Sequence, residues 1–246
     1  MDRIIGEILA GLADAQVEEA NVFERASLVL SRGAGLAYRF RKPGPRLVPP
    51  RLGSAMELAM LAHSSDPGEA SLGVAAINSL IEPAGAVPCA GGGADLLLEW
   101  GRGRDVALVG HFAFTEELRR EARRLWVLEL EPREGDLPAD QAGLYIPQAE
   151  VVAITGTTLI NHTLEGLLEL ARGKRVMILG PSTIMSPVLF DHGVEAICGS
   201  IIKDYGRVKG SLAQGKGLRS LEGTQKLILT RPEQDGVQSD GVAIIR

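Results

Sequence analysis

The fold of this chain is decided by residues 151–183, which read VVAITGTTLINHTLEGLLELARGKRVMILGPST. Two short apolar runs, 151–154 and 176–179, flank a segment in which leucines recur at helical spacing. A continuous apolar run is typical of a strand that is buried on both faces of a parallel sheet. Strand, helix and strand in this order predict a βαβ unit.

The same alternation continues on both sides of this unit. Further strands are predicted at 106–109, 125–130 and 196–202, and helices are predicted at 115–123, 158–172, 186–191 and 205–214. Gly173, Gly193 and Gly215 stand just after three of these helices, where glycine commonly ends a helix. Residues 105–246 are therefore predicted to form a Rossmann-like, doubly wound parallel sheet, with one apolar run at 227–229 left unassigned.

The N-terminal third has a different pattern. It begins with an amphipathic helix and continues with two strands, 23–30 and 36–41, whose connection contains two glycines and predicts a hairpin. Two helices follow, and Ser54 and Asp66 stand where residues that cap helix N-termini are expected. We therefore predict an α+β domain over residues 1–84 and a glycine-rich linker over 85–104.

Composition narrows the choice of partners. The 246 residues carry a net charge of −5, so no overall basic field attracts nucleic acid or an anionic membrane. Apolar stretches are too short for a membrane-spanning helix. Two cysteines are too few for a disulfide framework, and Cys198, in an apolar run, is expected to be buried. We expect a soluble, cytoplasmic protein with a small-molecule ligand. Formation of a homodimer is an open alternative.

Glycines and hydroxyl side chains follow the predicted strands at their carboxyl ends, where ligands collect in an open parallel sheet. Glycine lets a ligand approach the backbone, and hydroxyls at helix N-termini suit carboxylate or phosphate oxygens. We predict a site for a small anionic ligand formed by Gly110, Thr155, Gly156, Thr157, Thr158, Gly180, Pro181, Ser182, Thr183 and Asp204. The alternative is that these hydroxyls only cap helices.

His111 and Glu129 are the predicted reactive groups. Neutral imidazole suits both acid–base chemistry and metal binding, although a structural role beside Phe112 is the alternative for His111. Glu129 stands where Rossmann-type folds place an acid on a ribose hydroxyl, so an adenosine-like ligand stays open. Bulky residues replace the glycine-rich dinucleotide fingerprint, which disfavours an NAD enzyme. The sequence contains no zinc or iron motif, and a divalent metal ion is kept as an open hypothesis for the cofactor.

The strand-end segments together resemble a known family. They read VGHF at 109–112, EPREGDLP at 131–138, TGTTLINHT at 155–163 and GPST at 180–183, and the likeness continues through 186–190 and 199–204. They are similar to segments of a family of prokaryotic proteins named as heavy-metal chelatases. The resemblance covers most of residues 105–215, and Ile184 departs from it, because proline is expected at that position.

The resemblance implies an enolase N-terminal-like domain followed by the Rossmann-like domain, with the site between them. It adds Asn78 and Asn161 as candidates for ligand contact, and it makes His111 and Glu129 the candidate bases of a metal-inserting enzyme. The implied function is heavy-metal chelation or metal-cofactor metabolism, acting on a small anionic ligand or a metal complex. The alternatives are a non-catalytic small-molecule or metal-carrier module and an adenosine-cofactor-dependent transferase.

Overall fold

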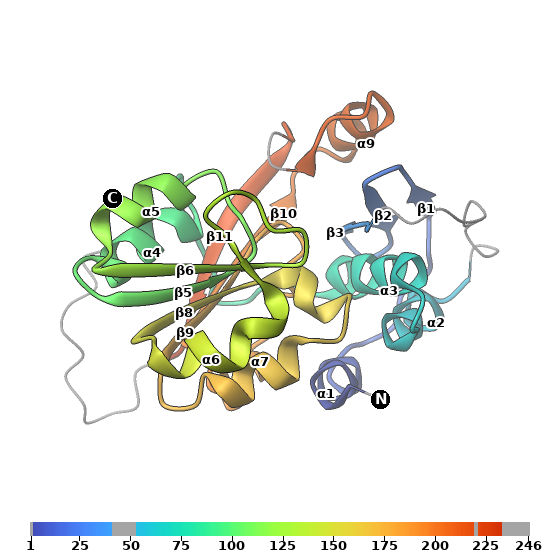
Figure 1. Cartoon of the computed structure of the whole chain (residues 1–246). Coiled ribbons are helices and arrows are strands. Elements are labelled where there is room, and N and C mark those ends of the chain that lie inside the picture. Colours follow the sequence, from blue (N-terminus) through green and yellow to red (C-terminus); the bar gives the residue numbers. More distant parts are fainter. Residues whose placement is uncertain (1, 41–52, 219–220, 233–246) are drawn as a thin grey trace.

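A computed structural model describes residues 2–40, 53–218 and 221–232, and it contains two sheets (Figure 1). The larger sheet has eight strands, and the smaller one has three. In spatial order the larger sheet consists of β4 (Val87–Pro88), β11 (Thr224–Thr230), β10 (Ala196–Ile202), β9 (Arg175–Leu179), β8 (Val151–Thr155), β5 (Asp105–Val109), β6 (Arg124–Glu129) and β7 (Leu137–Pro138).

The larger sheet is mostly parallel, as its apolar runs predict. The strands from β10 to β7 are parallel, whereas at one edge β11 pairs antiparallel with β10, and β4 pairs antiparallel with β11. The five predicted strands are confirmed to within one residue at each end, and the unassigned run at 227–229 lies in β11. The direction of winding reverses between β5 and β8, which is where ligands collect in doubly wound sheets. The mixed α/β class is therefore confirmed, while the Rossmann-like name stays a prediction.

Helices cover both faces of the larger sheet (Figure 1). On one face, α4 (Gly93–Gly101) and α5 (Thr115–Glu121) share an apolar cluster with β5 and its neighbours. On the other face lie α6 (Ala142–Tyr145), α7 (Leu164–Leu170) and α8 (Val188–Asp191), again in one cluster with the strands. Both faces are thus buried, which explains why the strands are continuous apolar runs.

The predicted helix over 158–172 is wrong in its first turns. A short 3-10 helix, η4 (Gly156–Leu159), follows β8, and α7 begins only at Leu164. Thr155 accepts a hydrogen bond from Thr157 N, and Asn161 Oδ1 accepts one from Thr163 N. Such side-chain hydrogen bonds compete with regular helix formation. Two more 3-10 helices, η2 (Ala139–Gln141) and η3 (Ile146–Gln148), flank α6.

The N-terminal part forms a three-stranded antiparallel sheet with three helices and one 3-10 helix. The predicted hairpin is confirmed as β2 and β3, but β1 was not predicted, and the predicted strand end at residue 41 lies outside the described residues. The predicted caps are confirmed, because Ser54 accepts from Glu57 N and Asp66 accepts from Glu69 N. The elements are α1 (Arg3–Ala10), β1 (Glu19–Val22), β2 (Ala26–Leu30), β3 (Ala34–Tyr38), α2 (Ala55–Ala59), η1 (Met60–His63) and α3 (Pro67–Leu80).

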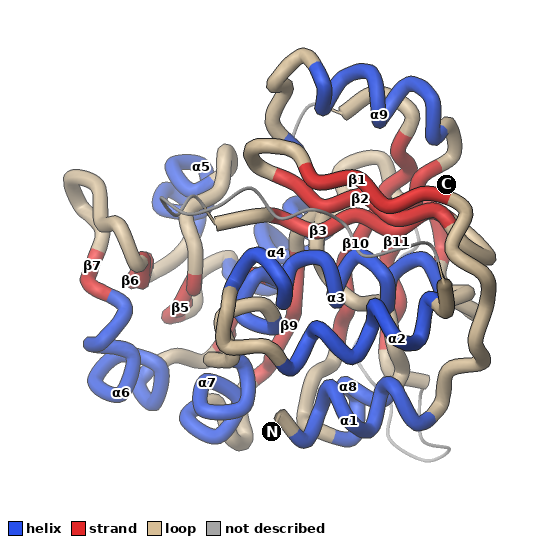
Figure 2. Tube along the Cα trace, turned by 90° about the vertical axis from the view of Figure 1, so that its right-hand side faces the viewer, coloured by secondary structure: helices blue, strands red, loops and turns tan. Residues whose placement is uncertain are grey.

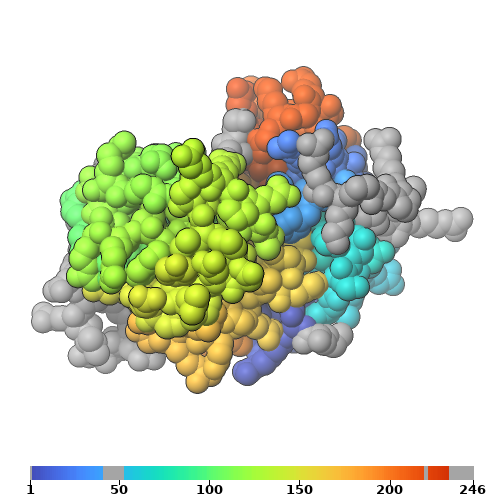
Figure 3. Space-filling model, in the orientation of Figure 1, coloured from blue at the N-terminus to red at the C-terminus, as the bar shows by residue number. Residues whose placement is uncertain are grey.

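The smaller sheet lies between α3 and a helix from the other end of the chain, α9 (Tyr205–Ala213) (Figures 2 and 3). Gly35 allows β3 to approach α3 closely, because a Cβ atom there would lie 2.0 Å from the Ala75 carbonyl oxygen. On the opposite face, Val208 and Leu212 of α9 pack with Leu28 of β2. A helix from the C-terminal part therefore completes the core of the N-terminal part.

The two parts of the chain also share their main apolar core. One cluster joins buried residues of α1 and α3 to strands and helices of the larger sheet. The segment 85–104, predicted as a linker, contains β4 and α4, and both pack with the larger sheet. The division into domains at 1–84 and 105–246 stays a prediction, as does the enolase-like name, and residues 233–246 lie outside the described residues.

Candidate functional site

Three strand-end turns meet at the point where the winding of the larger sheet reverses. Gly110 follows β5 with a φ of 101°, and Gly180 follows β9 with a φ of 124°. A Cβ atom on Gly110 would lie 3.2 Å from Thr155 Cβ, and one on Gly180 would lie 3.9 Å from Gly156 N. The structure therefore brings together the turns after β5, β8 and β9, all three of which contain predicted site residues.

Most hydroxyl groups of these turns have a hydrogen-bond partner. Thr155 Oγ1 lies 3.1 Å from Thr157 Oγ1, and Thr158 Oγ1 donates to the Thr155 carbonyl oxygen at 2.7 Å. Thr183 Oγ1, by contrast, is buried and has no hydrogen-bond partner among the described residues. A buried hydroxyl without a partner is costly, and such groups often mark a place where a water, an ion or a ligand binds.

His111 forms a pair that the sequence did not reveal. Its Nδ1 atom lies 3.0 and 3.1 Å from the two carboxylate oxygens of Asp136. The Asp136 side chain has no exposed surface, whereas 18% of the His111 side chain is exposed. Asp136 also accepts a hydrogen bond from Arg133 N, which holds the loop after β6 in place. A carboxylate on one ring nitrogen fixes the orientation of the imidazole.

Glu129 is the last residue of β6, next to this pair. Burial raises the pKa of Glu129 and outweighs the lowering by a hydrogen bond from Leu130 N; the nearby carboxylate of Asp136 raises the pKa further, and His111 lowers it slightly. Because β6 pairs with β5 in the sheet, Glu129, His111 and Asp136 form one group of titratable side chains. A half-buried carboxyl whose pKa is raised can hold a proton closer to neutral pH.

The N-terminal part touches the site through β3. Tyr38 N donates to Ser182 Oγ at 2.7 Å, so the end of β3 is held against the turn after β9. Asn78 Nδ2 donates to the Leu36 carbonyl oxygen at 3.0 Å and so ties α3 to β3. The hydrogen bond between Tyr38 and Ser182 brings the N-terminal part to one of the predicted turns.

Two other predicted residues have local structural roles. Asn161 accepts from Thr163 Oγ1 at 2.7 Å within its own turn. Asp204 is exposed and caps α9 by accepting from Arg207 N at 3.0 Å. These side-chain hydrogen bonds lie within the loop before α7 and the first turn of α9, respectively. Their assignment to the ligand site stays a prediction.

The described side chains do not form a complete metal-binding site. Among residues 2–40, 53–218 and 221–232, no three His, Cys, Asp or Glu side chains are grouped so that they could hold a metal ion. His111 and Asp136 supply two donors, and structural metal sites use about four. Within the described ranges, this pair alone has too few donors for a structural metal site.

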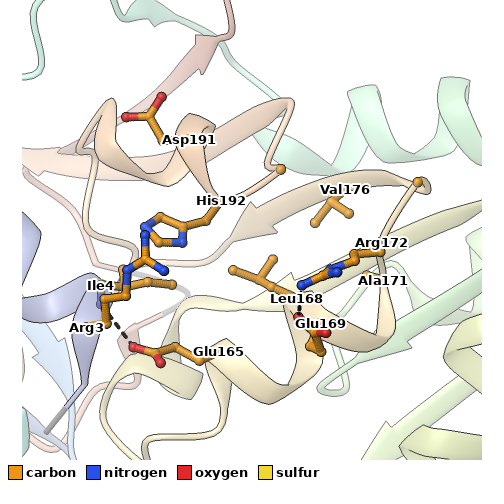
Figure 4. Close-up of a pocket in the computed structure, with 12 residues that line it drawn as sticks. Arg3, Ile4, Glu165, Leu168, Glu169, Ala171, Arg172, Val176, Asp191 and His192 are labelled. Carbon is orange, nitrogen blue, oxygen red and sulfur yellow. Dashed lines mark hydrogen bonds and ion pairs between the residues drawn. The ribbon is translucent and has the colours of Figure 1, made fainter.

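Two pockets in the described part of the chain lie elsewhere. One of about 430 Å³ is enclosed by α1, α7 and α8 (Figure 4). Several of its charged side chains already have protein partners: Glu165 accepts from Ile4 N, Arg172 pairs with Glu169, and His192 pairs with Glu7. A second pocket of about 550 Å³ lies beside Cys89 and Lys226. Neither pocket contains a predicted site residue, so the strand-end turns remain the candidate site.

The two cysteines lie outside the candidate site residues and differ in burial. Cys198 is buried as predicted, and burial raises the pKa of its thiol to about 12. Cys89 is half-buried, and both thiols are free of disulfide bonds.

The helices of the described residues are too short or too polar to span a bilayer.

A mixed α/β architecture with a mostly parallel eight-stranded sheet defines the class of this protein. Within that class the chain belongs to the DUF364 family, whose profile matches residues 93–231. A second profile, DUF4213, matches residues 5–81, and both carry the description "Putative heavy-metal chelation". The family predicted from the strand-end segments is thereby confirmed.

Solved structures and a curated relative agree with this membership. A DUF364-family crystal structure from Desulfitobacterium hafniense has a TM-score of 0.82 at 28% identity, covering 93% of this chain and 98% of that one. Another, from Pyrococcus horikoshii, has a TM-score of 0.76 at 18% identity over the same shares and shows the fold alone. An uncharacterized Methanocaldococcus jannaschii protein is 30% identical over 156 residues, which are 60% of each chain.

Proposed function

We propose that this protein binds a small anionic ligand or a metal complex at the strand-end turns and acts in heavy-metal chelation or metal-cofactor metabolism. The observation that carries the proposal is the meeting of the Gly110, Thr155–Gly156 and Gly180 turns beside the His111–Asp136 pair. The description of both matching profiles supports the metal-related part.

The chemistry of these groups suits such a ligand. Glycine turns and hydroxyls at the ends of parallel strands favour carboxylate or phosphate oxygens. His111, oriented by Asp136, can accept a proton or contact a metal that the ligand brings, and protonated Glu129 can donate a proton. Metal insertion into an organic ligand releases protons, so a base beside the bound ligand would serve that reaction.

Two alternatives use the same geometry. In the first, a non-catalytic small-molecule or metal-carrier module, the turns hold the ligand without changing it, and His111 only contacts it. In the second, a transferase with an adenosine cofactor, Glu129 would contact a ribose hydroxyl. The position of Glu129 at the end of β6, beside the reversal point, favours this second alternative.

Ligand-dependent thermal stability tests the proposal. Purified protein is screened against divalent metals, tetrapyrroles, S-adenosylmethionine and nucleotides, because a ligand that binds the folded state raises Tm. A ligand present at about 100 times its Kd adds about 2.7 kcal/mol. We expect a metal complex or tetrapyrrole to raise Tm, and His111→Ala and Thr155→Val to reduce that shift. His192→Ala and Thr230→Val make the same changes outside the site and should leave it unchanged.

The outcomes separate the hypotheses. A shift with S-adenosylmethionine alone supports the transferase. Binding that persists without turnover, and that His111→Ala weakens, supports the carrier. If neither metals nor tetrapyrroles move Tm, chelation loses its support, and if His111→Ala changes neither binding nor turnover, the role assigned to His111 is wrong.

A further inference from the structure

His162 has an unusual backbone conformation in the loop between η4 and α7. Its φ is 60°, and it is the one non-glycine residue with a positive φ within the described ranges. This left-handed region is unfavourable for side chains with a Cβ atom, so the surrounding contacts must hold the residue there. His162 also lies between the strand-end turn after β8 and the N-terminal part of the chain.

Both ring nitrogens of His162 contact acceptors from the N-terminal part. Nδ1 lies 2.5 Å from Asp2 Oδ2, just before α1, and Nε2 lies 2.7 Å from the Ser64 carbonyl oxygen, just after η1. A carbonyl oxygen can accept a hydrogen bond but cannot donate one, and the same holds for an ionised carboxylate. Both contacts are hydrogen bonds only if His162 carries a proton on each nitrogen.

The charged groups around this imidazole favour the protonated form. Burial lowers the pKa of His162, but the hydrogen bonds to Asp2 and to the Ser64 carbonyl outweigh it, so the pKa is raised above its ordinary value of 6.5. The chain's amino terminus opposes this effect weakly. His63 of η1 also faces His162, and burial lowers the pKa of His63, which keeps that neighbour uncharged near neutral pH.

We propose that His162 is a proton-dependent latch that joins the loop before α7 to the N-terminal part of the chain. With two protons it bridges Asp2 and Ser64. With one proton it keeps Asp2, the charged acceptor, and its bare Nε2 then faces the Ser64 carbonyl oxygen, so that the Ser64 contact is lost. This inference does not depend on the proposed function.

The latch is placed to influence the candidate site. Thr163 N, next to His162, donates to the Thr158 carbonyl oxygen at 3.0 Å, and Thr158 Oγ1 donates back to Thr155. Release of Ser64 would therefore loosen the loop that continues directly from the turn after β8. The sign follows from the raised pKa: the stabilisation is complete at acidic pH and is lost as pH rises from 6.5 through the folded-state pKa.

Two measurements on the full chain test the latch. An NMR titration of the imidazole resonances should give His162 a raised pKa, which Asp2→Asn lowers by about one unit or more. Between about pH 6 and pH 8.5, around the ordinary histidine pKa, Tm of the wild type should fall by about 2–4 °C more than Tm of His162→Asn. Asparagine is chosen because it tolerates the left-handed conformation. His192→Gln, which removes the imidazole–carboxylate contact with Glu7 of α1, is the matched comparison, and the latch requires His162→Asn to change the pH dependence more than His192→Gln does.

Two results would overturn the latch. One is a His162 that titrates at or below its ordinary value in the wild type, which would mean that its contacts do not favour the second proton. The other is a His162→Asn variant with the pH dependence of the wild type. If that variant does not fold, the titrations of the wild type and of Asp2→Asn decide alone.

Discussion

Gly156 lies so close to the turn after β9 that no larger residue fits. A Cβ atom there would be 2.6 Å from Thr183 Oγ1 and 2.7 Å from Thr183 Cα. Gly156→Ala should therefore destabilise the protein by about 1–3 kcal/mol, as overpacking does, in urea unfolding. Gly166→Ala is the control, because nothing lies within 4 Å of a Cβ atom in that position of α7. Alanine there should stabilise by up to about 1 kcal/mol, and equal effects of the two changes would contradict the contact.

At the scale of elements, Asp105 joins the starts of β5 and β6. Its buried carboxylate accepts from Arg123 Nε at 2.8 Å and also pairs with Arg124. The bonds to Arg123 and Arg124 hold the pKa of Asp105 far below its ordinary value of 3.8, so their stabilisation is present above that value and is lost as pH falls. Asp105→Asn should lower the urea midpoint near pH 6 and flatten its fall between about pH 5 and pH 2. The exposed Asp140, changed to Asn, should leave both unchanged.

At the scale of the whole molecule, α9 joins the C-terminal part of the chain to the small sheet of the N-terminal part. Leu212 is 5% exposed and packs in the cluster that contains Leu28 and Leu36 of the small sheet. Leu212→Ala should cost about 2–5 kcal/mol. Because the main core runs through both parts, calorimetry should still show one transition, shifted to lower temperature. Leu144→Ala, at a side chain that is 65% exposed, should change stability by less than about 0.5 kcal/mol. Separate transitions would show that the two parts unfold independently.

Secondary structure could be predicted best where burial alone decides it. Strands β5, β8 and β9 are buried on both faces, so their apolar runs stand out in the sequence. Strand β1 was missed because its residues are only half-buried and Glu19 and Asn21 are polar. The helix that begins at Leu164 was predicted to begin too early, because Leu159 and Ile160 are buried apolar residues like those of a helix. Local hydrogen bonds of Thr155 and Asn161 prevent a regular helix there.

Of the candidate site, only the positions of the strand-end turns could be predicted from the sequence. The glycines and hydroxyls after β5, β8 and β9 are neighbours because parallel strands end at one edge, which follows from the strand order. Asp136 was not assigned a role, because its charge resembles that of the exposed acids around it. Only Gly135, with a φ of 85°, marks the turn that brings Asp136 back to His111.

By itself, the sequence determined where the strands of the larger sheet lie, which turns follow them and to which family the chain belongs, because these depend on local patterns of burial and on short motifs. Only the tertiary structure decided the packing of α9 on the small sheet, the pairing of His111 with Asp136 and the contacts of His162 with Asp2 and Ser64. Those contacts join residues that are distant in the chain, and no local pattern records which distant partner a side chain will meet.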